Sequence, residues 1–90
     1  LNDASPVALK PAPIHVQIPA GMVFHEFEVS CPGGFRARGR FRNRAAMVRS
    51  VPPGVVCSAT FKGSEYARTP VRAGQNLTCT FGPTRCVNAR

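Results

Sequence analysis

The chain has 90 residues, of which 12 are Lys or Arg and four are Asp or Glu, so that the formal net charge is +8. Ninety residues allow one small domain with a modest core, and no stretch approaches the ~20 apolar residues that a membrane-spanning helix needs. The charge predicts an anionic partner, such as nucleic acid, an anionic glycan or a lipid headgroup surface. Solubility is the competing explanation, and charge alone does not separate the two.

The first residues differ in composition from the rest. Residues 1–13 contain Pro6, Pro11 and Pro13 among small residues, which predicts an extended lead-in or linker. Residues 14–90 are then expected to form a single β domain. Because the chain begins at Leu1 without a signal-like apolar run, we expect a mature or trimmed product.

Two strands are expected in residues 14–31. Residues 14–18 alternate, with their apolar side chains on one face. In residues 22–31, Val23, His25 and Phe27 share one parity with Val29 and Cys31. Glu26 and Glu28 have the other parity, so that a regular strand would point them away from His25. Residues 32–34, Pro-Gly-Gly, predict a turn.

Residues 35–44 place an arginine at every second position. One strand over this stretch would gather the arginines on one face, with Phe35 and Phe41 on the other, whereas a helix would scatter them. Gly39 predicts a bulge or a bend in the middle. The arginines are Arg36, Arg38, Arg40, Arg42 and Arg44.

The sequence also predicts short strands in the second half of the chain. Residues 45–51 favour a strand over a helical turn, and residues 55–61 and 76–81 alternate clearly. Pro70 places the weaker strand over residues 65–71 at a sheet edge. The expected fold is all-β, a small antiparallel sandwich or barrel of six to eight strands with two disulfides.

The four cysteines favour disulfides and an oxidising compartment. Cys79 and Cys86 flank a turn, which favours Cys79–Cys86 together with Cys31–Cys57. The alternative is Cys57–Cys79 with Cys31–Cys86. A zinc site is the main rival, but the chain has no Cys-x-x-Cys pair. The expected location is secreted or extracytoplasmic, in the periplasm or at the cell surface.

The acids and histidines of the chain do not favour catalysis. No pair of acids and histidines forms a catalytic dyad in the expected strands, so we expect no enzyme, no catalytic residue, no metal and no cofactor. Glu26 and Glu28 are instead expected to pair with arginines of the following strand in a hairpin. Asn76, Leu77 and Thr78 fit the acceptor pattern for N-glycosylation.

Residues 29–81 contain short turn motifs that resemble those of a known protein family. Residues 29–61 contain a Pro-Gly-Gly turn and a later Pro-Pro-Gly before the closing strand, and residues 55–81 contain Thr69-Pro70 and Ala73-Gly74. These features resemble PEGA-type repeats, small β modules of prokaryotic cell-surface and envelope proteins. The resemblance implies an extracytoplasmic accessory domain. The cysteines and the alternating arginines of this chain depart from the usual pattern of that family, and the resemblance implies no site residues.

The alternating arginines have three interpretations. They form a solvated sheet face that discourages edge-to-edge aggregation, a face for an anionic polymer, or a docking surface for a protein partner or a second copy. The sequence favours a non-enzymatic, secreted or cell-surface binding or assembly module, with its partner in the envelope or matrix. The alternative is a secreted cationic effector that binds anionic membrane, glycan or nucleic acid.

Overall fold

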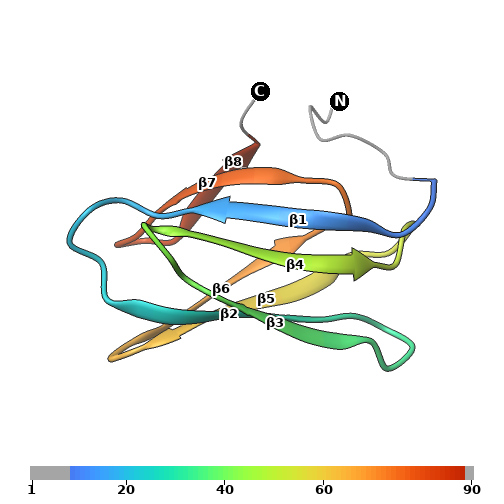
Figure 1. Ribbon diagram of the computed structural model, residues 1–90, viewed down its shortest axis with the longest axis horizontal. Coiled ribbons are helices and arrows are strands. Elements are labelled where there is room, and N and C mark those ends of the chain that lie inside the picture. Colours follow the sequence, from blue (N-terminus) through green and yellow to red (C-terminus); the bar gives the residue numbers. More distant parts are fainter. Residues whose placement is uncertain (1–8, 89–90) are drawn as a thin grey trace.

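The computed structural model describes residues 9–88, which form two four-stranded β-sheets packed on a common core (Figure 1). One sheet has the strand order β4-β1-β7-β8, and the other has the order β3-β2-β5-β6. No helix occurs among these residues. The strands are β1 (Ala12–Gln17), β2 (Phe24–Ser30), β3 (Arg36–Arg40), β4 (Ala45–Val51), β5 (Cys57–Gly63), β6 (Tyr66–Val71), β7 (Asn76–Thr80) and β8 (Arg85–Asn88).

The expected all-β sandwich is confirmed, with one parallel pair that the sequence does not predict. Neighbouring strands are antiparallel except β1 and β7. A parallel pair needs a crossover connection, and here the chain passes through β5 and β6 of the other sheet before it returns beside β1. The first strand begins at Ala12, two residues before the predicted start. Residues 1–8 of the predicted lead-in lie outside the described residues.

The core is built from the inward faces that the alternation predicts. Ile14 and Val16 of β1 are completely buried, as are Phe27 of β2 and Phe61 of β5. The Phe27 and Phe61 rings lie 5.1 Å apart between centroids, within the favourable range for aromatic pairs. Three further rings pack around this pair: Phe24, Phe41 and Phe81. Pro70 lies on edge strand β6, as predicted.

A break in the alternation occurs at the start of β2. The register between β2 and β5 shifts between Phe24 and Glu26, so Phe24 is buried while Val23 is 58% exposed. A β-bulge of this kind re-aims the side chains beside it. The strict alternation on which the expectation for His25 and Glu26 rests is interrupted here, and both residues line one surface depression.

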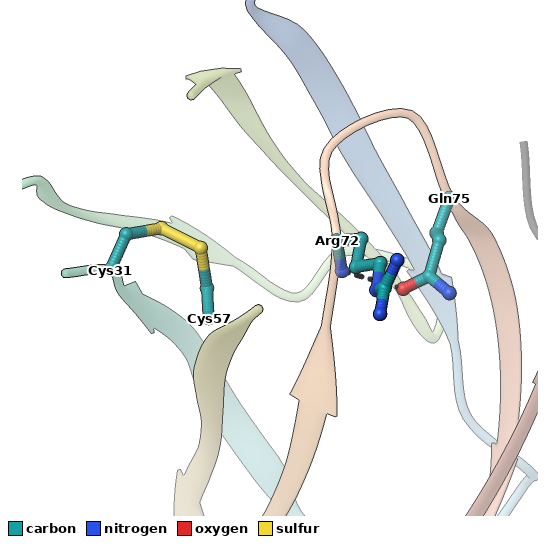
Figure 2. The surroundings of a disulfide bond; sticks show 4 residues. All are labelled: Cys31, Cys57, Arg72 and Gln75. Atoms are coloured by element: carbon teal, nitrogen blue, oxygen red, sulfur yellow. Dashed lines mark hydrogen bonds between the residues drawn. A yellow bond between two sulfur atoms is a disulfide. The ribbon is translucent and has the colours of Figure 1, made fainter. Parts of the chain in front are cut away.

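Both disulfides have the favoured pairing, and each joins neighbouring strands of one sheet. Cys31 follows β2 and bridges to Cys57 at the start of β5 (Figure 2). Cys79 of β7 lies directly opposite its partner Cys86 of β8, although the sequence leaves β8 unpredicted. Because all four cysteines are bridged, the alternative pairing and a zinc–thiolate site are both wrong.

Gly39 marks a close approach of β3 to strand β4 of the other sheet. A Cβ atom at this position would lie 2.2 Å from the backbone oxygen of Met47 in β4. Only a residue without a side chain fits there. The predicted bend at Gly39 is thus a close approach between the two sheets.

Replacing Gly39 with Ala should lower the free energy of unfolding by roughly 1–3 kcal/mol, the usual cost of overpacking, because the obstructing atom is backbone. Urea denaturation measures the change. Arg40→Ala, an outward position on the same strand, is the control and should change stability little. Equal stability of the two variants would contradict the close packing of β3 on β4.

Removing the Cys31–Cys57 disulfide should destabilise the domain more than removing Cys79–Cys86. The first closes a sequence separation of 26 residues and the second one of 7. The loss of loop-closure entropy then differs by about 1 kcal/mol. Guanidinium denaturation of the two double Cys→Ala variants measures the difference, and the opposite order would contradict it.

Candidate functional site

Three of the five predicted arginines lie on the outer face of the β3-β2-β5-β6 sheet. Arg36, Arg38 and Arg40 alternate along edge strand β3, and all three are exposed. The residues between them turn inward, and Phe41 beyond them packs against Phe27 at 6.3 Å between ring centroids. The arginine face predicted for this stretch is therefore present over β3.

The same outer face carries cations on β5 and β6. Lys62 of β5 shares its register row with Arg40, because both lie opposite Glu26 of β2. Arg68 of β6 lies opposite Thr60, in the row of Arg38. We call these outward side chains the basic face. Its members are Arg36, Arg38, Arg40, Lys62 and Arg68, with Glu26 and Glu28 between them.

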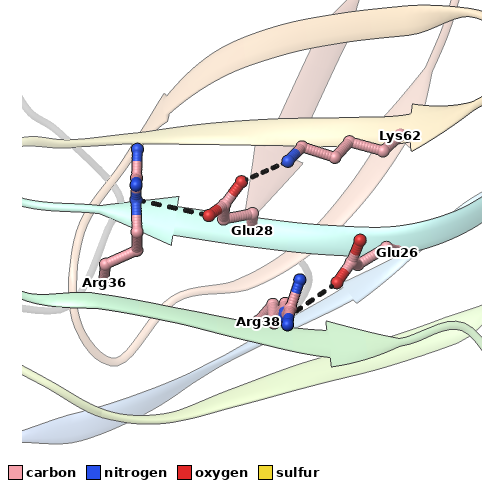
Figure 3. Close-up of polar contacts among 5 residues, drawn as sticks. All are labelled: Glu26, Glu28, Arg36, Arg38 and Lys62. Atoms are coloured by element: carbon pink, nitrogen blue, oxygen red, sulfur yellow. Dashed lines mark ion pairs between the residues drawn. The ribbon is translucent and has the colours of Figure 1, made fainter.

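The two glutamates form the predicted hairpin ion pairs. Glu28 Oε2 lies 3.3 Å from Arg36 Nε, and Glu26 Oε2 lies 3.2 Å from Arg38 Nε (Figure 3). Lys62 Nζ approaches Glu28 from the other side, at 2.5 Å from Oε1. Such exposed pairs contribute little stability, but they orient the arginines. Five cations against two carboxylates leave three net positive charges on the basic face.

The hydrogen bond from Lys62 lowers the pKa of Glu28, with smaller contributions from the charges of Lys62, Arg36 and Arg38. Desolvation of Glu28 opposes this effect in part. The carboxylate consequently stays ionised at neutral and mildly acidic pH. Within residues 9–88, Arg40 and Arg68 make no ion pair, so they carry two of the three net positive charges; the third arises because Glu28 is shared by Arg36 and Lys62.

The single strand predicted over residues 35–44 is wrong beyond Arg40. Arg42 forms an isolated bridge with Ala45, and their backbones exchange two hydrogen bonds of 2.8 and 3.0 Å. Asn43 and Arg44 between them have positive φ values of 50° and 66°, as a two-residue type I′ turn requires. This turn leads the chain from one sheet to the other and removes Arg42 and Arg44 from the arginine face.

A surface depression of about 710 Å³ lies where β2 meets β3. The bulge in β2 brings His25 to it beside Glu26, and Arg38 and Arg40 line the opposite strand. Its remaining lining comes from Phe24, Gly39 and Phe41. Arginine presents several N–H donors in a planar fork, so this depression suits a carboxylate, sulfate or phosphate group.

Tyr66 is a feature of the basic face that the sequence interpretation misses. It is 71% exposed and lies directly opposite Lys62. An exposed ring beside cations offers a surface on which a planar or cyclic group packs. Tyr66 alternates with Arg68 and Pro70 along the strand, and this alternation would have predicted that Tyr66 lies on the same outer face.

The outer face of the β4-β1-β7-β8 sheet carries polar residues at its centre and arginines on its edge strands. Exposed Asn76 and Thr78 of the glycosylation pattern lie on β7, opposite His15 and Gln17 of β1 respectively. Arg49 and Arg85 lie on its edge strands β4 and β8. Glycosylation at Asn76 stays a prediction. Arg72 lies in the β6–β7 turn, where its backbone N–H donates to Gln75 Oε1 at 2.8 Å (Figure 2).

Comparisons with protein-family models, with curated proteins and with solved structures find no match for this chain. The resemblance to PEGA-type repeats therefore stays a prediction. Within residues 9–88, no helix is long and apolar enough to cross a membrane.

Replacing Lys62 with Met should raise the pKa of Glu28 towards its ordinary value of 4.5, because the largest cause of the lowering is removed. A carboxyl group with a lowered folded-state pKa stabilises the fold above its unfolded-state pKa, and this stabilisation is lost as pH falls through the folded value. The loss of stability below pH 4.5 should consequently be smaller in the variant. An NMR titration of the Glu28 side-chain carbon, with Arg72→Met as control, measures the shift, and an unchanged pKa would contradict the pairing.

Proposed function

We propose that this chain is a non-enzymatic binding module that holds an anionic partner of the cell envelope or extracellular matrix against its basic face. The observation that carries the proposal is the charge on this one sheet face. Its five cations come from β3, β5 and β6, and Arg40 and Arg68 have no carboxylate partner among the described residues.

The two disulfides support a location outside the cytoplasm, as a secreted, periplasmic or cell-surface protein. Disulfides persist in oxidising compartments and are rare among cytosolic proteins. A small domain also gains stability from such bridges. The sequence resemblance to modules of prokaryotic envelope proteins points to the same location.

Charge favours a different molecule over a second copy as the partner. The whole chain has four acidic residues and 12 Lys and Arg residues. Two of the four acids, Glu26 and Glu28, already form ion pairs. Two basic faces in contact would repel each other. An acidic polymer or an acidic protein surface fits the face without this cost.

Removing three cations of the basic face should weaken retention on a sulfated polysaccharide by about tenfold or more, and should reduce its dependence on salt. The variant is Arg38→Ser with Arg40→Ser and Arg68→Ser, and elution from immobilised heparin is the measurement. The matched control is Arg49→Ser with Arg72→Ser and Arg85→Ser, which removes the same charge from exposed positions elsewhere.

The control should elute close to the unaltered protein. Equal weakening by both variants would mean that net charge alone drives retention, and an unchanged basic-face variant would reject the face as a binding site. Parallel sedimentation with anionic phospholipid vesicles tests the alternative of a cationic effector. Vesicle binding that depends on the basic face, without polysaccharide binding, would favour the effector.

A further inference from the structure

The turn between β3 and β4 holds a residue that its backbone disfavours. Arg44 has a φ of 66° at the second central position of the type I′ turn, where glycine is strongly preferred. A side chain in this left-handed conformation costs free energy that glycine does not. Backbone strain of this kind concentrates at functional sites, so the arginine at this position calls for a role of its side chain.

The surrounding contacts fix this turn in place. The backbone carbonyl of Arg44 accepts a hydrogen bond of 2.9 Å from the N–H of Ile18, just beyond β1. Arg42 and Ala45 close the turn with their two backbone hydrogen bonds. At the left of Figure 1 the chain reaches β4 beside the end of β1. Arg44 is consequently presented from a well-anchored corner of the sandwich.

A second depression, of about 220 Å³, lies at this corner on the outer side of the β4-β1-β7-β8 sheet. Among the described residues, Arg44 is the one charged residue in its lining, and the amides of Gln17 and Asn43 and the hydroxyls of two threonines supply the polar lining. The register brings these residues together, since Gln17 lies opposite Ala45 on one side and Thr78 on the other. The complete lining is Gln17, Ile18, Pro19, Asn43, Arg44, Thr78, Cys79 and Thr80.

The chemistry of this lining suits an acidic sugar. A guanidinium binds a carboxylate or sulfate through two parallel hydrogen bonds, while amides and hydroxyls both donate to and accept from sugar hydroxyls. Within residues 9–88 no aromatic ring lines the depression, so this part of the chain offers no stacking surface there for a nucleic-acid base. Its volume lies below the ~300 Å³ of sites for larger ligands, which fits one monosaccharide unit.

We infer that the depression at Arg44 binds one acidic sugar unit of an anionic polysaccharide. This inference rests on the proposed function, because the same polymer would continue onto the basic face. Arg40, at the end of β3 on the basic face, and Arg42, at the start of the turn, are both exposed, so exposed cations recur along the chain from the basic face to Arg44. The partner class is thus an acidic polysaccharide.

Arg44→Gly tests this assignment, because it should stabilise the fold while it weakens binding. Glycine relieves the left-handed strain, so the melting temperature should rise by a few degrees. Affinity for a uronic-acid oligosaccharide, measured by calorimetry, should fall at least tenfold. Affinity for a single-stranded DNA of equal charge should fall by less than twofold. The carboxyl-reduced, neutral form of the same oligosaccharide should bind weakly to both proteins.

Thr80→Val is the second variant, since it removes a lining hydroxyl from β7 without changing the charge. It should weaken uronate binding several-fold and leave DNA binding unchanged. Unchanged uronate binding in both variants would overturn the inference, and so would an equal loss of DNA and uronate binding in Arg44→Gly. Failure of the proposed function is distinguishable, because then the basic-face variant would bind all polyanions as the unaltered protein does.

Discussion

The antiparallel pairing of β2 with β5 is the constraint on which the rest of the structure depends. It brings Phe27 against Phe61 and Val29 against Ala59 on the buried side, and the Cys31–Cys57 disulfide bridges one end of the ladder. Since successive side chains alternate between faces, a slip of one residue would exchange the core side chains for charged ones. Burial of the core therefore fixes the register, and the register in turn fixes which charges lie next to each other on the outer face.

That register explains why a face rich in arginine is ordered. The glutamates of β2 lie between the cations of β3 and Lys62 of β5, so the positive charges of these two strands are separated by negative ones. The carboxylates hold Arg36 and Arg38 but are too few to neutralise the face. Arg40 and Arg68 remain without an ion pair among residues 9–88, and the turn that follows β3 places the exposed Arg44 where the chain enters the other sheet. An anionic chain that follows these cations would cross a corner of the sandwich.

Period-two alternation was enough to predict the strands that bury Ile14, Val16 and Phe61, because each has one apolar face. The edge position of β6 followed from Pro70, and the Cys79–Cys86 pair from its short loop. The bulge at Phe24 was not predictable in this way, since both faces of that segment begin apolar. The turn at residues 43–44 was missed because its second residue is arginine and not the glycine that marks such turns. Strand β8 has no clear inward face of its own and depends on its pairing with β7.

The central claim is that one sheet face, and not the overall charge, contacts an anionic partner. Chemical-shift mapping by NMR with a uronic-acid oligosaccharide tests it most directly, because each arginine side chain reports separately. The largest shifts are expected at the Nε–H groups of Arg38, Arg40 and Arg68 and at the Arg44 turn, with small shifts at Arg49 and Arg85. Shifts spread evenly over all exposed arginines, or concentrated at Arg49 and Arg85, would contradict the claim.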